Sequence, residues 1–152
     1  MNEEQLTKSI LKWLIGNDWK IIAFDFPQSG TGLMIHPDML TSNKNKKGII
    51  PDIITIKNSV CLFFENKDRF YYSDFLKQNE LIIGGEYKKS IETILAGYDV
   101  KDIFYGIGLP KNVNEGVLKE NKHLVDFIVM VDPLTNQVKL FHDKHAIDRF
   151  FD

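Results

Sequence analysis

The sequence of 152 residues predicts an α/β domain in which helices flank a central mixed β-sheet. Two segments, Ile49–Lys57 and Val60–Asn66, are rich in β-branched and aromatic residues, as strands are, and only Asn58-Ser59 separates them. A helical stretch and then the apolar segment Ile103–Leu109 follow. A strand, a helix and another strand form a crossover unit, whose two strands are parallel. The sheet should therefore combine an antiparallel hairpin with a parallel pair.

The composition indicates one ordinary domain over residues 1–152. Hydrophobic residues make up 43% and charged residues 26% of the chain, which is normal for a globular protein. The net charge of −2 weighs mildly against a protein that coats nucleic acid without specificity, because such a domain is usually strongly basic. It does not exclude a sequence-specific enzyme acting on nucleic acid, since local charge matters more than the sum.

Residue usage also predicts the compartment. The single cysteine, Cys61, excludes an internal disulfide and favours a reducing environment. The N-terminal residues MNEEQ are acidic, unlike a secretory signal, and no apolar run approaches the length of about 18 residues that spans a membrane. We therefore expect a cytoplasmic protein without membrane contact.

The N-terminal third predicts a helix, a strand and a long loop. Apolar residues recur at helical spacing between Glu3 and Ile15, and a strand is expected from Trp19 to Phe26. The apolar positions of the helix are Leu6, Ile10, Trp13 and Leu14. From residue 27 to residue 48 the chain is polar and rich in glycine. A stretch of roughly 20 residues without clear secondary structure in a compact domain indicates a functional loop or a disordered one.

After the first hairpin, helices again alternate with strands. Ser73 is a candidate N-cap for one helix, and Glu86–Ala96 predicts a second. His123–Pro133 and Gln137–His142 predict a second hairpin. The segment Lys144–Phe151 predicts a short tail helix, whose apolar stripe suits either core packing or a dimer contact.

The two-residue turn fixes the register of the first hairpin. Residues directly opposite in an antiparallel pair project from the same face, with Cβ atoms about 5 Å apart. Counting outward from the turn pairs Lys57 with Val60, Ile56 with Cys61, Ile54 with Phe63, and Asp52 with Glu65. Lys67 shares the face of Glu65, because side chains alternate along a strand. The sequence thus predicts two carboxylates and one ammonium group clustered at the end of an apolar hairpin.

This cluster calls for a further cation. Like charges placed opposite each other destabilise a sheet, and Lys67 supplies only one compensating charge. A divalent metal ion between Asp52 and Glu65 would supply the rest. Carboxylate oxygens suit hard ions such as Mg²⁺, which is usually held by one or two carboxylates, water and substrate phosphate. Other chemistries are less supported, because no Cys/His arrangement fits zinc and no glycine-rich loop fits a nucleotide.

The cluster resembles the motif of the PD-(D/E)xK nuclease superfamily, which includes many restriction endonucleases and several repair and recombination nucleases. Pro51-Asp52, twelve further residues and then Glu65-Asn66-Lys67 match its pattern. The resemblance covers the chain from about Ile49 to Pro110 and implies a restriction-endonuclease-like core. A single domain of this fold would then occupy residues 1–152.

The resemblance also implies a chemistry, which is the hydrolysis of DNA phosphodiester bonds with Mg²⁺, for which Mn²⁺ should substitute. Asp52 and Glu65 would bind the metal, with the backbone carbonyl of Asn66 as a further ligand. Lys67 would orient the attacking water and stabilise the pentavalent transition state. Loss of Asp52, Glu65 or Lys67 should lower the rate by orders of magnitude and leave DNA binding intact.

Two acidic positions outside the hairpin are related to this motif. Many nucleases of the family carry an acidic residue on an early helix that joins the metal site, which makes Glu4, ahead of Glu3, a candidate fourth catalytic residue. The first turn of a helix also favours acidic residues for its dipole alone. Pro37-Asp38 repeats the first dipeptide of the motif, but no apolar strand follows it to place it opposite Glu65.

The polar loop and the start of the following helix offer side chains that suit phosphates and base edges. For any one of them a solvated surface position is the simpler interpretation, and this holds for Lys77 as well. For the loop as a whole, which directly precedes the hairpin, we expect DNA contact. The candidate DNA-binding residues are Gln28, Ser29, Thr31, Lys44, Lys46, Lys47 and Arg69.

The expected function is a metal-dependent endonuclease of double-stranded DNA, in particular a site-specific type II restriction endonuclease or its subunit. Cutting both strands with one active site per chain normally requires a homodimer or a partner subunit. One alternative is a structure-selective repair or recombination nuclease of the resolvase kind. Another is a non-catalytic protein of the same fold that binds DNA or a partner. A third is an unrelated α/β interaction protein whose polar cluster is a surface salt bridge.

Overall fold

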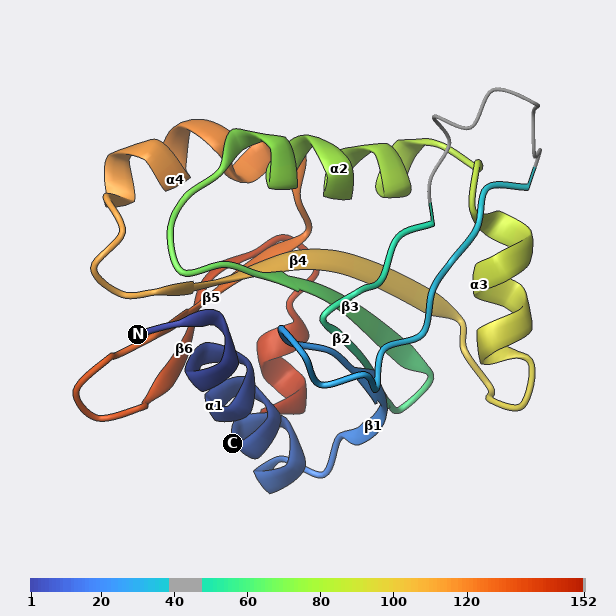
Figure 1. The fold of residues 1–152 in the computed structure, drawn as a ribbon, viewed down its shortest axis with the longest axis horizontal. Helices are drawn as coiled ribbons and strands as arrows, with labels where there is room; N and C mark the ends of the chain where they lie inside the picture. Colours follow the sequence, from blue (N-terminus) through green and yellow to red (C-terminus); the bar gives the residue numbers. More distant parts are fainter. Residues whose placement is uncertain (39–47, 152) are drawn as a thin grey trace.

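The computed structural model describes residues 1–38 and 48–151 and shows an α+β fold with one six-stranded sheet (Figure 1). The strands lie in the sheet in their chain order, from β1 to β6. The elements are α1 (Glu3–Gly16), β1 (Lys20–Phe24), β2 (Ile53–Lys57), β3 (Val60–Asn66), α2 (Tyr72–Ile83), α3 (Lys88–Leu95), β4 (Asp102–Pro110), α4 (Glu115–Asn121), β5 (Phe127–Val131), β6 (Val138–Asp143) and the 3₁₀ turns η1 (Lys122–Leu124) and η2 (Ile147–Phe150).

The sheet is mixed, as the sequence predicts. Strand β3 pairs in parallel with β4, and β4 with β5, whereas the other neighbouring strands are antiparallel. The β2–β3 hairpin has the predicted register, with Lys57 opposite Val60 and Ile54 opposite Phe63. Its turn residues Asn58 and Ser59 both have positive φ, of 50° and 67°. A two-residue turn of this kind has the twist that antiparallel strands require, so the turn holds the register.

Several predicted boundaries differ from those of the structure. The strand predicted from His123 begins only at Phe127, because Lys122–Leu124 form the 3₁₀ turn η1. Strand β2 begins at Ile53, because Ile49 instead forms an isolated bridge with Ile35 and Pro51 has no N–H for a ladder. Helix α2 begins one residue before Ser73, and its N-cap residue makes no side-chain cap hydrogen bond. The tail contains only η2, because Ala146 adopts φ 54°, which interrupts any helix running from residue 144.

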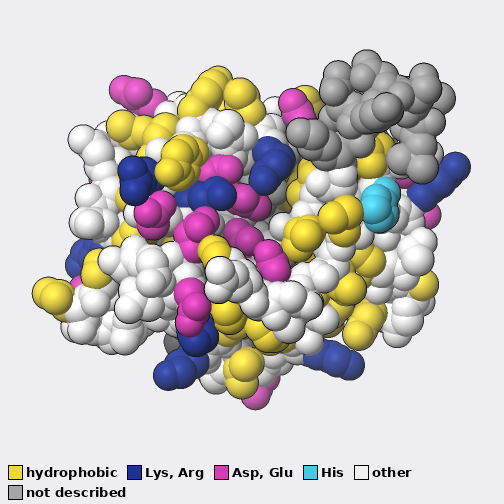
Figure 2. Space-filling view, in the orientation of Figure 1, with side chains coloured by type: hydrophobic (Ala, Val, Ile, Leu, Met, Phe, Trp, Pro, Cys, Tyr) yellow, Lys and Arg dark blue, Asp and Glu magenta, His cyan; other side chains and the backbone are white. Residues whose placement is uncertain are grey.

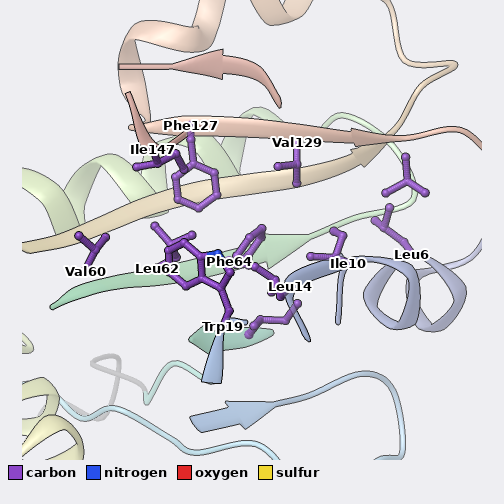
Figure 3. Close-up of a cluster of buried hydrophobic side chains, with 12 residues drawn as sticks. Leu6, Ile10, Leu14, Trp19, Val60, Leu62, Phe64, Phe127, Val129 and Ile147 are labelled. Atoms are coloured by element: carbon purple, nitrogen blue, oxygen red, sulfur yellow. The ribbon is translucent and has the colours of Figure 1, made fainter. Parts of the chain in front are cut away.

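The sheet is the middle of three layers. On one face, α1 and η2 pack over a cluster of buried apolar side chains that includes Phe64 and Phe127, whose ring centroids are 4.9 Å apart (Figure 3). On the other face, α2, α3 and α4 cover two further clusters, with Phe63 and Phe75 among their buried residues. Successive residues of β3 alternate between these faces, as the pleat of a strand requires. No helix within residues 1–38 and 48–151 is long and apolar enough to cross a membrane.

Strand β4 passes close to its neighbours at Gly108, which pairs with Asn66 of β3. A Cβ atom added at Gly108 would lie 2.3 Å from Asn66 Oδ1 and 2.6 Å from the Ile10 side chain. We expect Gly108→Ala to lower the free energy of unfolding by about 3 kcal/mol, because both contacts are buried and tightly packed. Urea unfolding should show this loss, whereas Gly97→Ala, which meets no atom within 4 Å, should stay within about 0.5 kcal/mol of wild type. Equal stability of the two variants would contradict the packing described for α1 and β4.

Candidate active site

The β2–β3 hairpin brings Asp52 and Glu65 together on the face of the sheet that α2 covers. Asp52 extends the ladder by one residue, because its N–H donates to the Phe64 carbonyl over 2.9 Å. Its Oδ2 accepts a hydrogen bond of 2.6 Å from the backbone N–H of Asn66. Glu65 is 6% exposed and lies one position from Phe64 on β3. Because the turn contains two residues, the two carboxylates share a face, which is the arrangement that the nuclease interpretation requires.

Two lysines approach Glu65. Lys67, just beyond the end of β3, places Nζ 3.7 Å from Glu65 Oε1. Lys77 of α2 donates a hydrogen bond of 3.0 Å to the same oxygen. Figure 2 shows acidic side chains gathered on this face of the molecule with basic side chains among them. The predicted cluster of Asp52, Glu65 and Lys67 is thus assembled, and Lys77 joins it.

Helix α1 contributes Glu3 to the cluster and not Glu4. Glu3 Oε1 lies 3.5 Å from Lys67 Nζ. Glu4 points along the helix surface, where its Oε2 accepts a hydrogen bond of 2.8 Å from Lys8, one turn further on. Of the two candidates for a fourth acidic site residue, the structure therefore places Glu3, and not the preferred Glu4, beside Lys67. Adjacent residues on a helix face directions about 100° apart, so only one of the two can face the sheet.

Asp74, in the first turn of α2, is a site residue that the sequence analysis missed. It is 7% exposed, and its Oδ2 has no hydrogen-bond partner among the residues that the structure describes. Together with Glu3 and Lys67 it lines a pocket of about 190 Å³. The signal in the sequence was the spacing of Asp74 and Lys77, because residues three apart on a helix lie on one face.

Burial and mutual repulsion perturb the carboxylates. Burial, with the charge of Glu65 as the second cause, raises the pKa of Asp52 to about 8. Burial also raises the pKa of Glu65 above its ordinary value, although the bonded ammonium of Lys77 opposes this. The pKa of Asp74 is raised by burial as well. Each shift means that the neighbouring protein groups do not fully compensate the negative form of the carboxyl group.

Lys67 lies among these acids. Burial alone would lower the pKa of its ammonium group, but the nearby carboxylates, Glu65 first and then Asp74, outweigh burial and raise the pKa. Lys67 is therefore a cation at neutral pH. The four carboxylates of Glu3, Asp52, Glu65 and Asp74 face the two ammonium groups of Lys67 and Lys77, so a fully ionised cluster would carry two excess negative charges.

The cluster fits a divalent cation of the magnesium kind. Over residues 1–38 and 48–151, no three acidic, histidine or cysteine side chains are grouped closely enough to form a complete metal cage. Mg²⁺ does not need such a cage, because it commonly binds through one or two carboxylates and completes its shell with water and substrate phosphate. The opposed oxygens of Asp52 and Glu65, the excess negative charge and the unpartnered Asp74 Oδ2 all suit it.

Of the predicted DNA-binding residues that the structure describes, Ser29 and Thr31 are hydrogen-bonded to each other over 3.1 Å, and no hydrogen bond or ion pair joins Arg69 to them. Ser29 and Thr31 use their hydroxyls within the loop, where Ser29 bonds Asp25 and Thr31 donates to the Phe24 carbonyl. Gln28 is exposed at a position of positive φ, 70°. Arg69 is exposed and pairs with its neighbour Asp68 at 3.2 Å. Residues Lys44, Lys46 and Lys47 lie outside the described residues, so contact between this loop and DNA stays a prediction.

Neither models of known protein families nor curated proteins match this chain.

Proposed function

We propose that this chain is a metal-dependent nuclease with a restriction-endonuclease-like core, and that it hydrolyses phosphodiester bonds of DNA. The observation that supports this most is the pairing of Asp52 with Glu65 at the end of the β2–β3 hairpin, with Lys67 beside them. The ionised forms of Asp52 and Glu65 lower the stability of the fold, since burial raises the pKa of both acids. Buried like charges with perturbed pKa values are typical of functional sites.

In this proposal each residue has a separate task. Asp52 and Glu65 would hold Mg²⁺, with the backbone carbonyl of Asn66 as a further ligand. When bound, the metal lowers the pKa of its water and offsets negative charge on the phosphate. Lys67 stays protonated among the carboxylates, so it serves as a hydrogen-bond donor that orients the attacking water and stabilises the pentavalent phosphorus. Glu3 holds Lys67 in place through the 3.5 Å ion pair.

The finer assignment is a site-specific restriction endonuclease that acts on double-stranded DNA as a homodimer or with a partner subunit. One hydrolytic centre per chain cuts one strand, so cleavage of a duplex at one position calls for two copies related by symmetry. The compact single centre would equally serve a structure-selective nuclease. The substrate panel below distinguishes the two.

Cleavage assays test the proposal. Supercoiled plasmid, genomic DNA, branched junctions and RNA are incubated with the full chain and Mg²⁺ or Mn²⁺, and in parallel with a chelator. We expect metal-dependent cleavage of DNA by wild type and none by Lys67→Ala. Discrete bands would indicate site specificity, and cleavage confined to junctions would indicate structure selectivity.

One control variant and one check for contamination accompany the cleavage assays. Asp38→Asn alters the other Pro-Asp dipeptide, whose carboxylate accepts a hydrogen bond from the Lys89 N–H, and should cleave like wild type. Activity that persists in both Lys67→Ala and Asp52→Ala would reveal a contaminating nuclease, whereas activity that persists in Lys67→Ala alone would contradict the role proposed for Lys67. A wild-type chain that is inert on every substrate would refute the proposal for the isolated protein and favour a binding role.

A further inference from the structure

Lys77 stands out because it occupies one of the two carboxylate oxygens of Glu65, an acid that is proposed to bind the metal. Its Nζ lies 3.0 Å from Glu65 Oε1, closer than the 3.7 Å of Lys67 to the same atom. The side chain of Glu65 is 7% exposed, so few other orientations are open to it. Among the described residues, Lys77 is therefore the main counter-charge of Glu65, the acid that would bind the cation.

A cation and the Lys77 ammonium cannot share that oxygen at low cost. Mg²⁺ binds oxygen at about 2.1 Å, which would bring it within about 5 Å of an ammonium that is still hydrogen-bonded there. Two like charges at such a separation repel strongly in a partly buried site. Binding of the cation through Glu65 should therefore displace the Lys77 side chain.

The displaced ammonium would remain close to the reacting phosphate, because α2 is firmly docked. The amide of the neighbouring Gln78 donates to the carbonyls of Phe63 and Gly106, over 3.3 and 2.7 Å. Phe75, two residues before Lys77 on α2, is also buried in the core, where it is 1% exposed. Only the flexible stem of Lys77 can move, and its side chain, 33% exposed, already reaches the surface of the site.

We propose that Lys77 is a substrate-binding residue that stays hydrogen-bonded to Glu65 until a divalent cation displaces it. It bonds Glu65 in the metal-free protein, and when a divalent cation takes its place it turns to the phosphodiester and donates to a non-bridging oxygen of the scissile phosphate. Lysine suits this role as a compact, mobile charge with three donors. This inference rests on the proposed nuclease function and adds to it a residue outside the sequence motif.

Lys77→Met tests the inference because the variant should bind the cation more tightly and yet cleave DNA more slowly. In the full-length protein without DNA, Mn²⁺ should bind about tenfold more tightly to the variant, since a charged hydrogen-bonded competitor is gone. At saturating Mn²⁺ the same variant should cleave DNA about tenfold to a hundredfold more slowly. Paramagnetic resonance of free Mn²⁺ measures the first quantity and a fluorescent oligonucleotide assay the second.

Two further variants serve as controls. Lys8→Met removes another lysine from an ion pair, the exposed 2.8 Å pair with Glu4 on α1, and should change neither quantity. Lys77→Arg keeps the charge and should bind Mn²⁺ as weakly as wild type, which separates charge from packing.

Unchanged or weaker Mn²⁺ binding by Lys77→Met would overturn the inference and leave the nuclease proposal standing. Tighter Mn²⁺ binding with wild-type cleavage would also overturn it, because Lys77 would then not act on the substrate. Wild type that binds no Mn²⁺ and cleaves nothing would instead contradict the proposed function itself.

Discussion

Asp52→Asn should abolish cleavage and at the same time make the metal-free protein more stable. We expect the rate with saturating Mg²⁺ to fall by at least about a thousandfold, because the variant loses a charged metal ligand. Asparagine can still accept the hydrogen bond that the Asn66 N–H donates to residue 52 over 2.6 Å. The fold therefore keeps its contact and loses only the buried charge.

The gain in stability depends on pH in a defined direction. Burial and the charge of Glu65 raise the pKa of Asp52 to about 8, against about 3.9 in an unfolded chain. Between these values the folded protein holds a proton that the unfolded chain has lost, so wild-type stability falls as pH rises from about 4 to about 8. The advantage of Asp52→Asn should vanish near pH 4 and reach a few kcal/mol above pH 8.

Urea unfolding in the presence of a chelator, at pH 5 and pH 8.5, measures this difference. Asp38→Asn is the matched control, because it makes the same chemical change at the other Pro-Asp dipeptide, for which no such gain is expected. A variant Asp52→Asn that is less stable than wild type at pH 8.5 would show that the Asp52 charge is well compensated in the fold.

The affinity for divalent cations should itself rise with pH. A cation must displace the proton that Asp52 holds below its raised pKa of about 8. The apparent affinity for Mn²⁺ should therefore increase about tenfold for each pH unit between 6 and 8, and level off at higher pH. Because protonation removes the ligand, the metal-dependent cleavage rate at limiting metal should follow the same curve.

Calorimetric titration in buffers of different ionisation enthalpy gives both the affinity and the number of protons released. We expect close to one proton per Mn²⁺ at pH 6.5 and almost none at pH 9. If the affinity for Mn²⁺ stays constant from pH 6 to pH 8, Asp52 is not a ligand of the metal.

The parts of the fold that the sequence predicts are those set by local rules. The two-residue turn at Asn58-Ser59 determines the hairpin register, and the register alone brings Asp52 opposite Glu65. The parallel pairing of β3 with β4 follows from the helical crossover between them. The narrower identification as a restriction-endonuclease-like core stays a proposal.

The parts that the sequence does not predict depend on how elements are rotated against each other. Glu3 and Glu4 are equivalent in sequence, and only the docking of α1 on the sheet decides that Glu3 faces Lys67. Asp74 and Lys77 belong to a helix whose start the sequence misplaces at Ser73. The approach of Lys77 to Glu65 depends on packing between α2 and β3, which helix periodicity cannot specify.

The buried carboxyl groups of the site lower the stability of the fold. Glu65 and Asp74 are both nearly buried, and burial raises the pKa of each. A protein selected only for stability would replace such groups with apolar or amide side chains. The proposed cation and substrate would compensate these charges during function.

The most direct test of this account is a crystal structure of the protein with Mn²⁺, with the ion located by its anomalous scattering. We predict a peak about 2.1 to 2.2 Å from carboxylate oxygens of both Asp52 and Glu65, with Lys77 displaced from Glu65 Oε1. A fully occupied Mn²⁺ elsewhere on the molecule, with the Lys77–Glu65 bond of 3.0 Å intact, would contradict it.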